Sequence, residues 1–281
     1  MSITKDTQNI RKGLSDREAI LLSTLAKDGK SIIEYNDVSN ALQTTYPNAR
    51  KIVERLTKKK WLIKISKGKY LISPLSAGTK SEYTEHEFVI ASNLAGKKSY
   101  YIAYWSALNH YGYTEQTPLT VFVATNSRIA NTTVHGVKYR FITINKKKFF
   151  GTKNHFIGNK KIIISDKNKT IVDALDHPEY CGGIEEVAKC LWHAKEDISF
   201  DTIIKYSKKM QNSTIIKRLG YLIDVLEIKI SPSLYNQMLN SIGSGRSLLN
   251  HHSTKNKKSN LKWKLFVNTS IDTLLEIKSA T

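Results

Sequence analysis

The sequence predicts an α+β protein with two domains. An N-terminal winged helix-turn-helix domain, residues 1–80, is followed by a mixed α/β domain, residues 81–281, whose second half is helical. Three patterns predict this organisation: an amphipathic basic helix, a basic hairpin directly after it, and a later stretch of alternating strand-like and helix-like segments. A chain of 281 residues is long enough for two domains with separate cores.

The basic helix begins the segment 46–72, YPNARKIVERLTKKKWLIKISKGKYLI. Asn48 is expected to cap its start, with Pro47 in the turn that enters it. The apolar side chains follow the spacing i, i+3, i+4 and i+7, which places them in one stripe of a helix: Ala49, Ile52, Val53 and Leu56. The opposite face is polar and basic.

The periodicity then changes from helical to alternating. Trp61, Ile63 and Ile65 fall on one face, and the run 67–69, Lys-Gly-Lys, makes a tight turn into the apolar residues 70–72. This pattern predicts a β-hairpin with a basic tip.

Two further helices are expected before the basic one. Ser15 and Glu18 have the spacing of a capping box, and that helix ends at the Asp-Gly pair 28–29. A shorter helix is expected over 37–43 with Asn36 as its cap. Three helices and a hairpin in this order predict a winged helix-turn-helix.

Charge in this region indicates contact with DNA. Residues 50–69 contain nine Lys or Arg and a single acid, Glu54, and a helix that enters the major groove needs donors for bases and phosphates. The alternative is a solvated basic helix in a small structural domain. The residues predicted to bind DNA lie on the helix, the strand after it and the wing: Thr45, Asn48, Arg50, Lys51, Arg55, Lys58, Lys64, Lys67 and Lys69.

The net charge of +20 and the pI near 9.7 predict a polyanionic partner, either nucleic acid or an anionic membrane. Residues 81–281 are basic themselves, with 28 basic and 17 acidic groups. No apolar run approaches the roughly 20 residues that span a membrane, and the N-terminus lacks the apolar core of a signal peptide. Two cysteines indicate a reducing compartment. We therefore expect a cytoplasmic protein with no membrane partner.

The second domain is expected to alternate strands and helices before it becomes helical. The aromatic residues of 99–110 have helical spacing, which favours a core role over a platform for stacked bases. Residues 125–136 are expected to be a polar connection. The expected helices are 85–94, 99–110, 167–175, 184–193, 201–210, 213–226 and 232–242, with a short one at the end, and the expected strands are 119–124, 137–144, 161–165 and 261–268.

Several segments of this domain resemble the AbiEi antitoxin family of type IV toxin–antitoxin, or abortive-infection, systems. They are YYIAYWSALNHYGYTEQTP (100–118), ISDKNKTIVDAL (164–175), HPEYCGGIEEV (177–187), NSTIIKRLGYLID (212–224) and KWKLFVN (262–268). The resemblance implies a repressor that binds inverted repeats in its own promoter. It also implies that the protein counters a neighbouring nucleotidyltransferase toxin without forming a stable complex with it.

Three patterns in the sequence are similar to known catalytic or metal-binding sets, and none of them predicts a catalytic residue, a metal site or a cofactor. His177, Cys181, Cys190 and His193 have the spacing of a zinc site only if the glycines 182–183 fold back sharply; the alternative is a core cysteine with incidental histidines. The Gly-Ser pair 243–244 is similar to a nucleotidyltransferase loop but lacks the carboxylates that hold Mg²⁺ downstream.

The third pattern, Asp224, Glu227 and Lys229, faintly resembles the carboxylate-lysine set of nucleases, but it falls where a helix ends and is read as a solvated face. We therefore expect no enzyme. Two alternatives stay open: a nuclease-like RNA- or DNA-processing enzyme targeted by a winged helix, and an antitoxin that binds only protein. Duplex binding that needs no metal and depends on the basic helix and the wing would distinguish the repressor from both of these alternatives.

Overall fold

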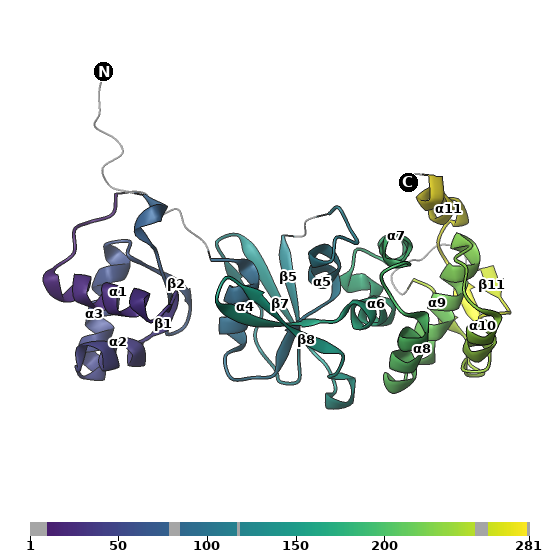
Figure 1. Ribbon diagram of the computed structural model, residues 1–281, viewed down its shortest axis with the longest axis horizontal. Coiled ribbons are helices and arrows are strands. Elements are labelled where there is room, and N and C mark those ends of the chain that lie inside the picture. The colour runs from purple at the N-terminus through teal and green to yellow at the C-terminus, as the bar shows by residue number, and fades with distance from the viewer. Residues whose placement is uncertain (1–9, 79–84, 117–118, 251–257, 280–281) are drawn as a thin grey trace, which may run out of the picture. The chain divides into compact units, whose positions relative to one another are not determined.

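The computed structural model describes residues 10–78, 85–116, 119–250 and 258–279 (Figure 1). The chain divides into two compact units, Met1–Leu94 and Ala95–Thr281. The expected boundary after residue 80 lies within residues 79–84, outside the described ranges. Over the described residues the chain is mixed α and β, with 11 α-helices and three sheets, in agreement with the expected α+β class.

The first unit begins with a helix and a strand, continues with two helices, and then forms a hairpin. Its three strands make an antiparallel sheet in the order β1-β3-β2, in which β1 pairs with β3 and β3 with β2. Its elements are α1 (Asp16–Lys27), β1 (Ile32–Glu34), α2 (Tyr35–Leu42), α3 (Tyr46–Lys58), β2 (Leu62–Ser66), β3 (Lys69–Ile72), a 3-10 turn (Leu75–Ala77) and α4 (Glu87–Ala95).

The core of the first unit contains the predicted apolar stripe of α3. All four stripe residues are buried, and they belong to one cluster with residues of α1, α2 and the hairpin. Burying a side chain of this size stabilises the fold by roughly 1.5–3 kcal/mol. The stripe therefore fixes the rotation of α3 about its axis and leaves the basic face in solvent.

Two of the expected helix starts are wrong. The helix α3 begins at Tyr46 with Thr45 as its N-cap, so that Asn48 lies inside the first turn and does not cap the helix. Pro47 is tolerated in the same turn because the first N–H groups of a helix have no hydrogen-bond partner within the helix. The helix α2 begins at Tyr35, because Glu34 and Asp37 form a capping box and the Glu34 N–H donates to Asp37 at 2.7 Å. The Ser15–Glu18 capping box of α1 is confirmed.

The second unit contains a six-stranded mixed sheet in the order β6-β7-β5-β4-β9-β8, and a small three-stranded sheet in the order β10-β12-β11. From α6 onward helices dominate, and in Figure 1 α8, α9 and α10 gather at the end of this unit away from β5 and β7. The strands are β4 (Tyr100–Ile102), β5 (Thr120–Thr125), β6 (Thr132–Val134), β7 (Val137–Thr143), β8 (Thr152–Ile157), β9 (Lys160–Ser165), β10 (Ser247–Leu248), β11 (Lys258–Asn260) and β12 (Leu265–Val267). The helices are α5 (Tyr104–His110), α6 (Lys167–Asp176), α7 (Ile184–Ala194), α8 (Phe200–Lys209), α9 (Ser213–Leu226), α10 (Pro232–Leu239) and α11 (Ile271–Ser279), with 3-10 turns at Lys146–Lys148 and Pro178–Tyr180.

The sheet corrects three expectations. The expected helix 99–110 is strand β4 followed by α5, and Tyr104 at the break has a φ of 53°. Strand β4 is central and all three of its residues are buried, so its burial does not alternate. The expected connection 125–136 contains β6, and β8 was not expected at all. Both lie at the edges of the sheet, where few residues face the core.

The aromatic residues of this region are core, as expected. Tyr101 and Tyr104 are buried, and Tyr101 donates to Asp173 of α6 at 3.1 Å. Lys169, also buried, forms an ion pair with the same carboxylate. Asp166 caps α6 by accepting the Lys169 N–H at 2.7 Å. These polar groups therefore join strand β4 to helix α6.

Trp263 forms a close contact between the C-terminal segment and α9. Trp263 is fully buried, and its indole N–H donates to Asp224 at 2.7 Å. A Cβ built on Gly220 would lie 2.3 Å from the ring of Trp263, closer than real carbon atoms approach. Position 220 therefore has no room for a side chain. Within the described ranges, no helix is long and apolar enough to cross a membrane.

We expect Gly220→Ala to lower the free energy of unfolding by about 2 kcal/mol, because the added methyl group overpacks the Trp263 contact. The sign of this change distinguishes overpacking from helix propensity, since alanine in a helix interior normally stabilises the helix by about 1 kcal/mol relative to glycine. Urea denaturation followed by circular dichroism measures the change. The matched control is Gly245→Ala, where a Cβ would have nothing within 4 Å. An unchanged or higher midpoint for Gly220→Ala would contradict the close contact.

Candidate nucleic-acid interface

The predicted DNA-binding residues lie along α3 and the β2–β3 hairpin, and most of them are exposed. The six on or next to α3 are all exposed, as are Lys64 and Lys67 of the hairpin; Lys69 is only partly exposed. The unit therefore presents a continuous set of cationic and polar side chains along one helix and the hairpin that follows it.

Both arginines of the predicted set have acidic neighbours. Arg50 Nε lies 3.0 Å from Glu54 Oε1 in an exposed i, i+4 pair, and such pairs contribute only about 0.3–0.5 kcal/mol. Arg55 Nε lies 3.7 Å from Glu18, while 61% of its own side chain stays exposed. The four exposed lysines of the set form no ion pair with any described residue: Lys51, Lys58, Lys64 and Lys67. These lysines are available for phosphate groups.

Lys69 differs from the other predicted residues. Its ammonium group donates to the backbone carbonyl of Asn93 in the last turn of α4 and lies 3.7 Å from Glu34. With 21% of its side chain exposed, it is largely committed to contacts inside the protein. Its placement fits a residue that holds the hairpin better than one that reaches a phosphate.

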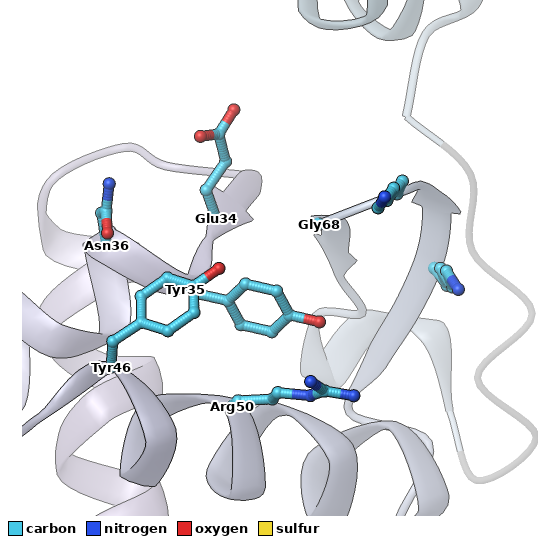
Figure 2. Close-up of a pocket in the computed structure, with 8 residues that line it drawn as sticks. Glu34, Tyr35, Asn36, Tyr46, Arg50 and Gly68 are labelled. Carbon is cyan, nitrogen blue, oxygen red and sulfur yellow. The ribbon is translucent and has the colours of Figure 1, made fainter.

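A groove of about 590 Å³ separates the start of α3 from the hairpin. Figure 2 shows Tyr35, Tyr46 and Arg50 extending into it, with Gly68 at the turn of the hairpin on the facing side. The remaining lining residues are Glu34, Asn36, Lys64 and Lys67. The groove thus combines cations with two phenol groups, which donate hydrogen bonds to phosphate oxygens or stack against bases.

The width of this groove is set by a pair of tyrosines. The hydroxyl groups of Tyr35 on α2 and Tyr70 on β3 lie 2.7 Å apart. Burial, together with this hydrogen bond, raises the pKa of Tyr70 to about 12. Tyr35 also packs edge-on against Tyr46, with ring centroids 5.4 Å apart. Gly68 has a φ of +75°, which the tight turn requires and which other residues rarely adopt.

Glu18 anchors the other end of the basic helix. Only 2% of its side chain is exposed; it accepts from Lys59 Nζ at 2.6 Å and from the Ser15 N–H at 2.9 Å. Burial by itself raises the pKa of Glu18, but the hydrogen bonds from Lys59 and Ser15 outweigh it, and the pKa lies below its ordinary value. One carboxylate therefore caps α1 and neutralises the cationic end of α3.

The groove tyrosines and the second role of Glu18 were not expected from the sequence patterns. Tyr35 is the first residue of α2 and Tyr46 is the first residue of α3, and this repetition at two consecutive helix starts is the one signal in the sequence. Asn36 was expected as a cap and instead lines the groove. Nothing in the local spacing shows that Glu18 meets Lys59, which is 41 residues away.

The suggested zinc residues do not form a metal site in the structure. Cys181 and Cys190 are fully buried, and burial raises the pKa of both thiols. His177 is instead hydrogen bonded to Glu179 at 2.8 Å. Within the described ranges, no three His, Cys, Asp or Glu side chains are arranged to hold a metal ion.

The nuclease-like carboxylate is occupied by internal contacts. Asp224 accepts from Tyr235 at 2.6 Å and from Trp263 at 2.7 Å, and Lys262 lies 2.9 Å away. These contacts use both of its oxygens. The Gly-Ser loop at 243–245 is held by Lys217, which donates to the Gly245 carbonyl; residues 251–257 of the same connection lie outside the described ranges.

We expect Glu18→Gln to lower the free energy of unfolding by about 2 kcal/mol at neutral pH, since a buried charge-assisted contact is lost. The pKa of Glu18 is lower in the folded than in the unfolded chain. Its contribution is therefore complete above the unfolded pKa and is lost as the pH falls through the folded one. The difference between wild type and variant should shrink accordingly in acid, which urea titrations across pH would measure.

Glu54→Gln is the matched control for this experiment, because Glu54 forms an exposed pair with an α3 arginine. It should change stability by less than about 0.5 kcal/mol. The anchoring role of Glu18 would be contradicted if Glu18→Gln lowered the free energy of unfolding as little as the control does. It would also be contradicted if the loss of stability did not depend on pH.

The comparisons with known proteins bear on the fold alone. No protein-family model and no curated protein matches the sequence. Among solved structures, the chain is similar to the crystal structure of the RV2827C protein from Mycobacterium tuberculosis, with a TM-score of 0.71 and 13% sequence identity. The alignment covers 96% of this chain and 98% of that one. The same arrangement of elements therefore occurs in a protein whose sequence is almost entirely different.

Proposed function

We propose that the first unit is a winged helix-turn-helix that binds double-stranded DNA sequence-specifically, and that the chain acts as a transcriptional repressor. In this proposal α3 enters the major groove and the β2–β3 hairpin is the wing. The observation that carries it is the combination of a buried apolar stripe with an exposed cationic face on one helix, next to an exposed cationic hairpin. This is the arrangement that groove recognition needs.

The positions of the predicted residues support different tasks within this proposal. Arg50 and Lys51 would contact base edges, because they lie in the first half of α3 and recognition helices contact bases near their N-terminal ends. Lys64 and Lys67 would contact the backbone. Tyr46, 54% exposed at the first position of α3, extends the groove-facing set beyond the residues expected from sequence.

The resemblance of the second unit to the AbiEi antitoxin family supports a more specific proposal. The chain would be the antitoxin of a type IV system in the cytoplasm: it would repress its own operon by binding inverted repeats. It would also counteract a nucleotidyltransferase toxin without a stable complex and without being an enzyme itself. The second unit has its own extensive core, which is consistent with a separate activity there.

We expect DNA binding to depend strongly on salt. If about six phosphates are contacted, log K should fall against log salt with a slope of about −5. Lys67→Ala should reduce this slope by about one unit, whereas Lys69→Ala should change it less, because its ammonium group is already bound to a carbonyl and lies near Glu34. Fluorescence anisotropy with duplexes selected from a random pool measures both. A slope near −1 would contradict contact with several phosphates. Equal reductions of the slope for Lys67→Ala and Lys69→Ala would contradict the different roles given to the two lysines.

We expect repression and toxin rescue to be separable. Arg50→Glu combined with Lys67→Glu should abolish repression of a promoter–reporter fusion, because two cations that face the groove become anions. Rescue from the toxin should persist when the variant is expressed from a foreign promoter. Lys153→Glu, an exposed lysine of the second unit, controls for loss of positive charge. A folded double variant that also fails to rescue would show that both activities share one surface.

A further inference from the structure

The second unit contains a cleft of about 380 Å³ at β5, β6 and β7 that the proposed repressor function does not use. Its size lies at the lower end of the range for small-molecule sites, about 300–1,000 Å³. Among the residues that line it, the only charged ones are Lys138 and Arg140, and neither forms an ion pair with a described carboxylate. The cleft is therefore suited to an anion.

Strand register places the cations beside an aromatic ring. In the parallel pair β5–β7, Phe122 lies opposite Arg140 and Thr120 opposite Lys138. Residues two apart share a face of a sheet, so both cations lie on the face that carries Phe122. Thr133 of β6 lies opposite Lys138 in the antiparallel pair at the edge. The cleft thus has two cations, one ring and hydroxyl groups within three adjacent strands.

Arg140 is also the outermost member of a stack of planar groups. Its guanidinium carbon lies 4.7 Å from the centroid of Tyr180. Tyr180 in turn lies nearly parallel to His177, with ring centroids 5.3 Å apart and an angle of 20° between the planes. Arg140 is exposed, so a further planar group has room to stack on it. Arginine planes positioned in this way commonly carry unpaired bases.

Asn131 supplies directional donors at the same cleft. Its side-chain oxygen accepts from the Phe141 N–H at 2.9 Å, which fixes the side chain at the end of the β6–β7 hairpin. No described residue accepts a hydrogen bond from the amide N–H groups of Asn131, which can therefore donate to a ligand. A polar group of a base or a sugar is the type of partner that such donors recognise.

We propose that this cleft binds one nucleotide, with the base stacked on Arg140 and the phosphate held by Lys138. The ligand is either a free nucleoside phosphate or one nucleotide of a single strand, since both carry the same base and phosphate. The site does not depend on the groove of the first unit, and it stands even if duplex binding fails.

The experiment uses the full chain with Arg50→Glu and Lys67→Glu, so that the groove of the first unit does not contribute. Isothermal titration compares AMP and CMP, inorganic phosphate, and short single-stranded RNA and DNA. Nucleotides should bind at least about tenfold more tightly than inorganic phosphate, because stacking adds to the ionic contact. A single strand that binds no better than AMP or CMP indicates a free nucleotide, and tighter binding of the strand indicates strand recognition; both results support the site.

Three variants test the roles of the cations. Arg140→Ala and Lys138→Ala should each weaken nucleotide binding about tenfold or more, whereas Arg140→Lys should keep phosphate binding but lose the preference for nucleotides. The matched control is Lys153→Ala on the opposite edge strand β8, where a lysine also lies over a tyrosine ring, 5.0 Å from the centroid of Tyr111. Equal affinity for phosphate and nucleotides, absence of nucleotide binding, or Arg140 variants that bind like wild type would overturn the proposal.

Discussion

A buried carboxylate makes the arrangement of the first unit possible. A helix as basic as α3 has to lie against a small apolar core, and its cationic end would repel the start of any neighbouring helix. Glu18 removes this difficulty because it accepts from Lys59, lies near Arg55, and caps α1 with the same side chain. Since the carboxylate is buried and keeps its charge, α3 cannot slide or rotate without leaving that charge unpaired.

The hairpin is held by a second, separate set of contacts. The Tyr35–Tyr70 hydrogen bond joins β3 to the start of α2, and Lys69 ties the same strand to α4. The two walls of the groove are thus fixed by different residues: Glu18 holds the helix and the tyrosines hold the hairpin. Because a recognition surface loses less entropy on binding when its parts are already in place, both sets of contacts are expected to matter for affinity through the positions in which they hold the groove walls.

Sequence patterns predicted the elements whose periodicity reflects a single buried face. The stripe of α3 was right for that reason. The bounds of α9, 213–226, were also right, although most of that helix is buried. Strand β4 was missed because it is buried throughout, and β8 because an edge strand has few core residues. The residues predicted to bind DNA lie along α3 and the β2–β3 hairpin, and one of them, Lys69, has a partner that is distant in sequence. The roles of Lys69, Tyr35 and Glu18 depend on contacts between elements, and local spacing does not encode those.

The two units combine cations with aromatic rings in different geometries, and the geometry decides what each can bind. In the first unit the cations lie on a projecting helix and hairpin, which can follow the grooves and backbone of a duplex. In the second unit Lys138 and Arg140 lie on the face of a sheet beside Phe122 and Tyr180. In the proposed site, a cleft of that size would take a single base and its phosphate, whereas the bases of a duplex are already stacked and would not be available to Arg140. A net charge of +20 therefore does not by itself define one nucleic-acid function; the same charge, divided between two cores, suits two kinds of ligand.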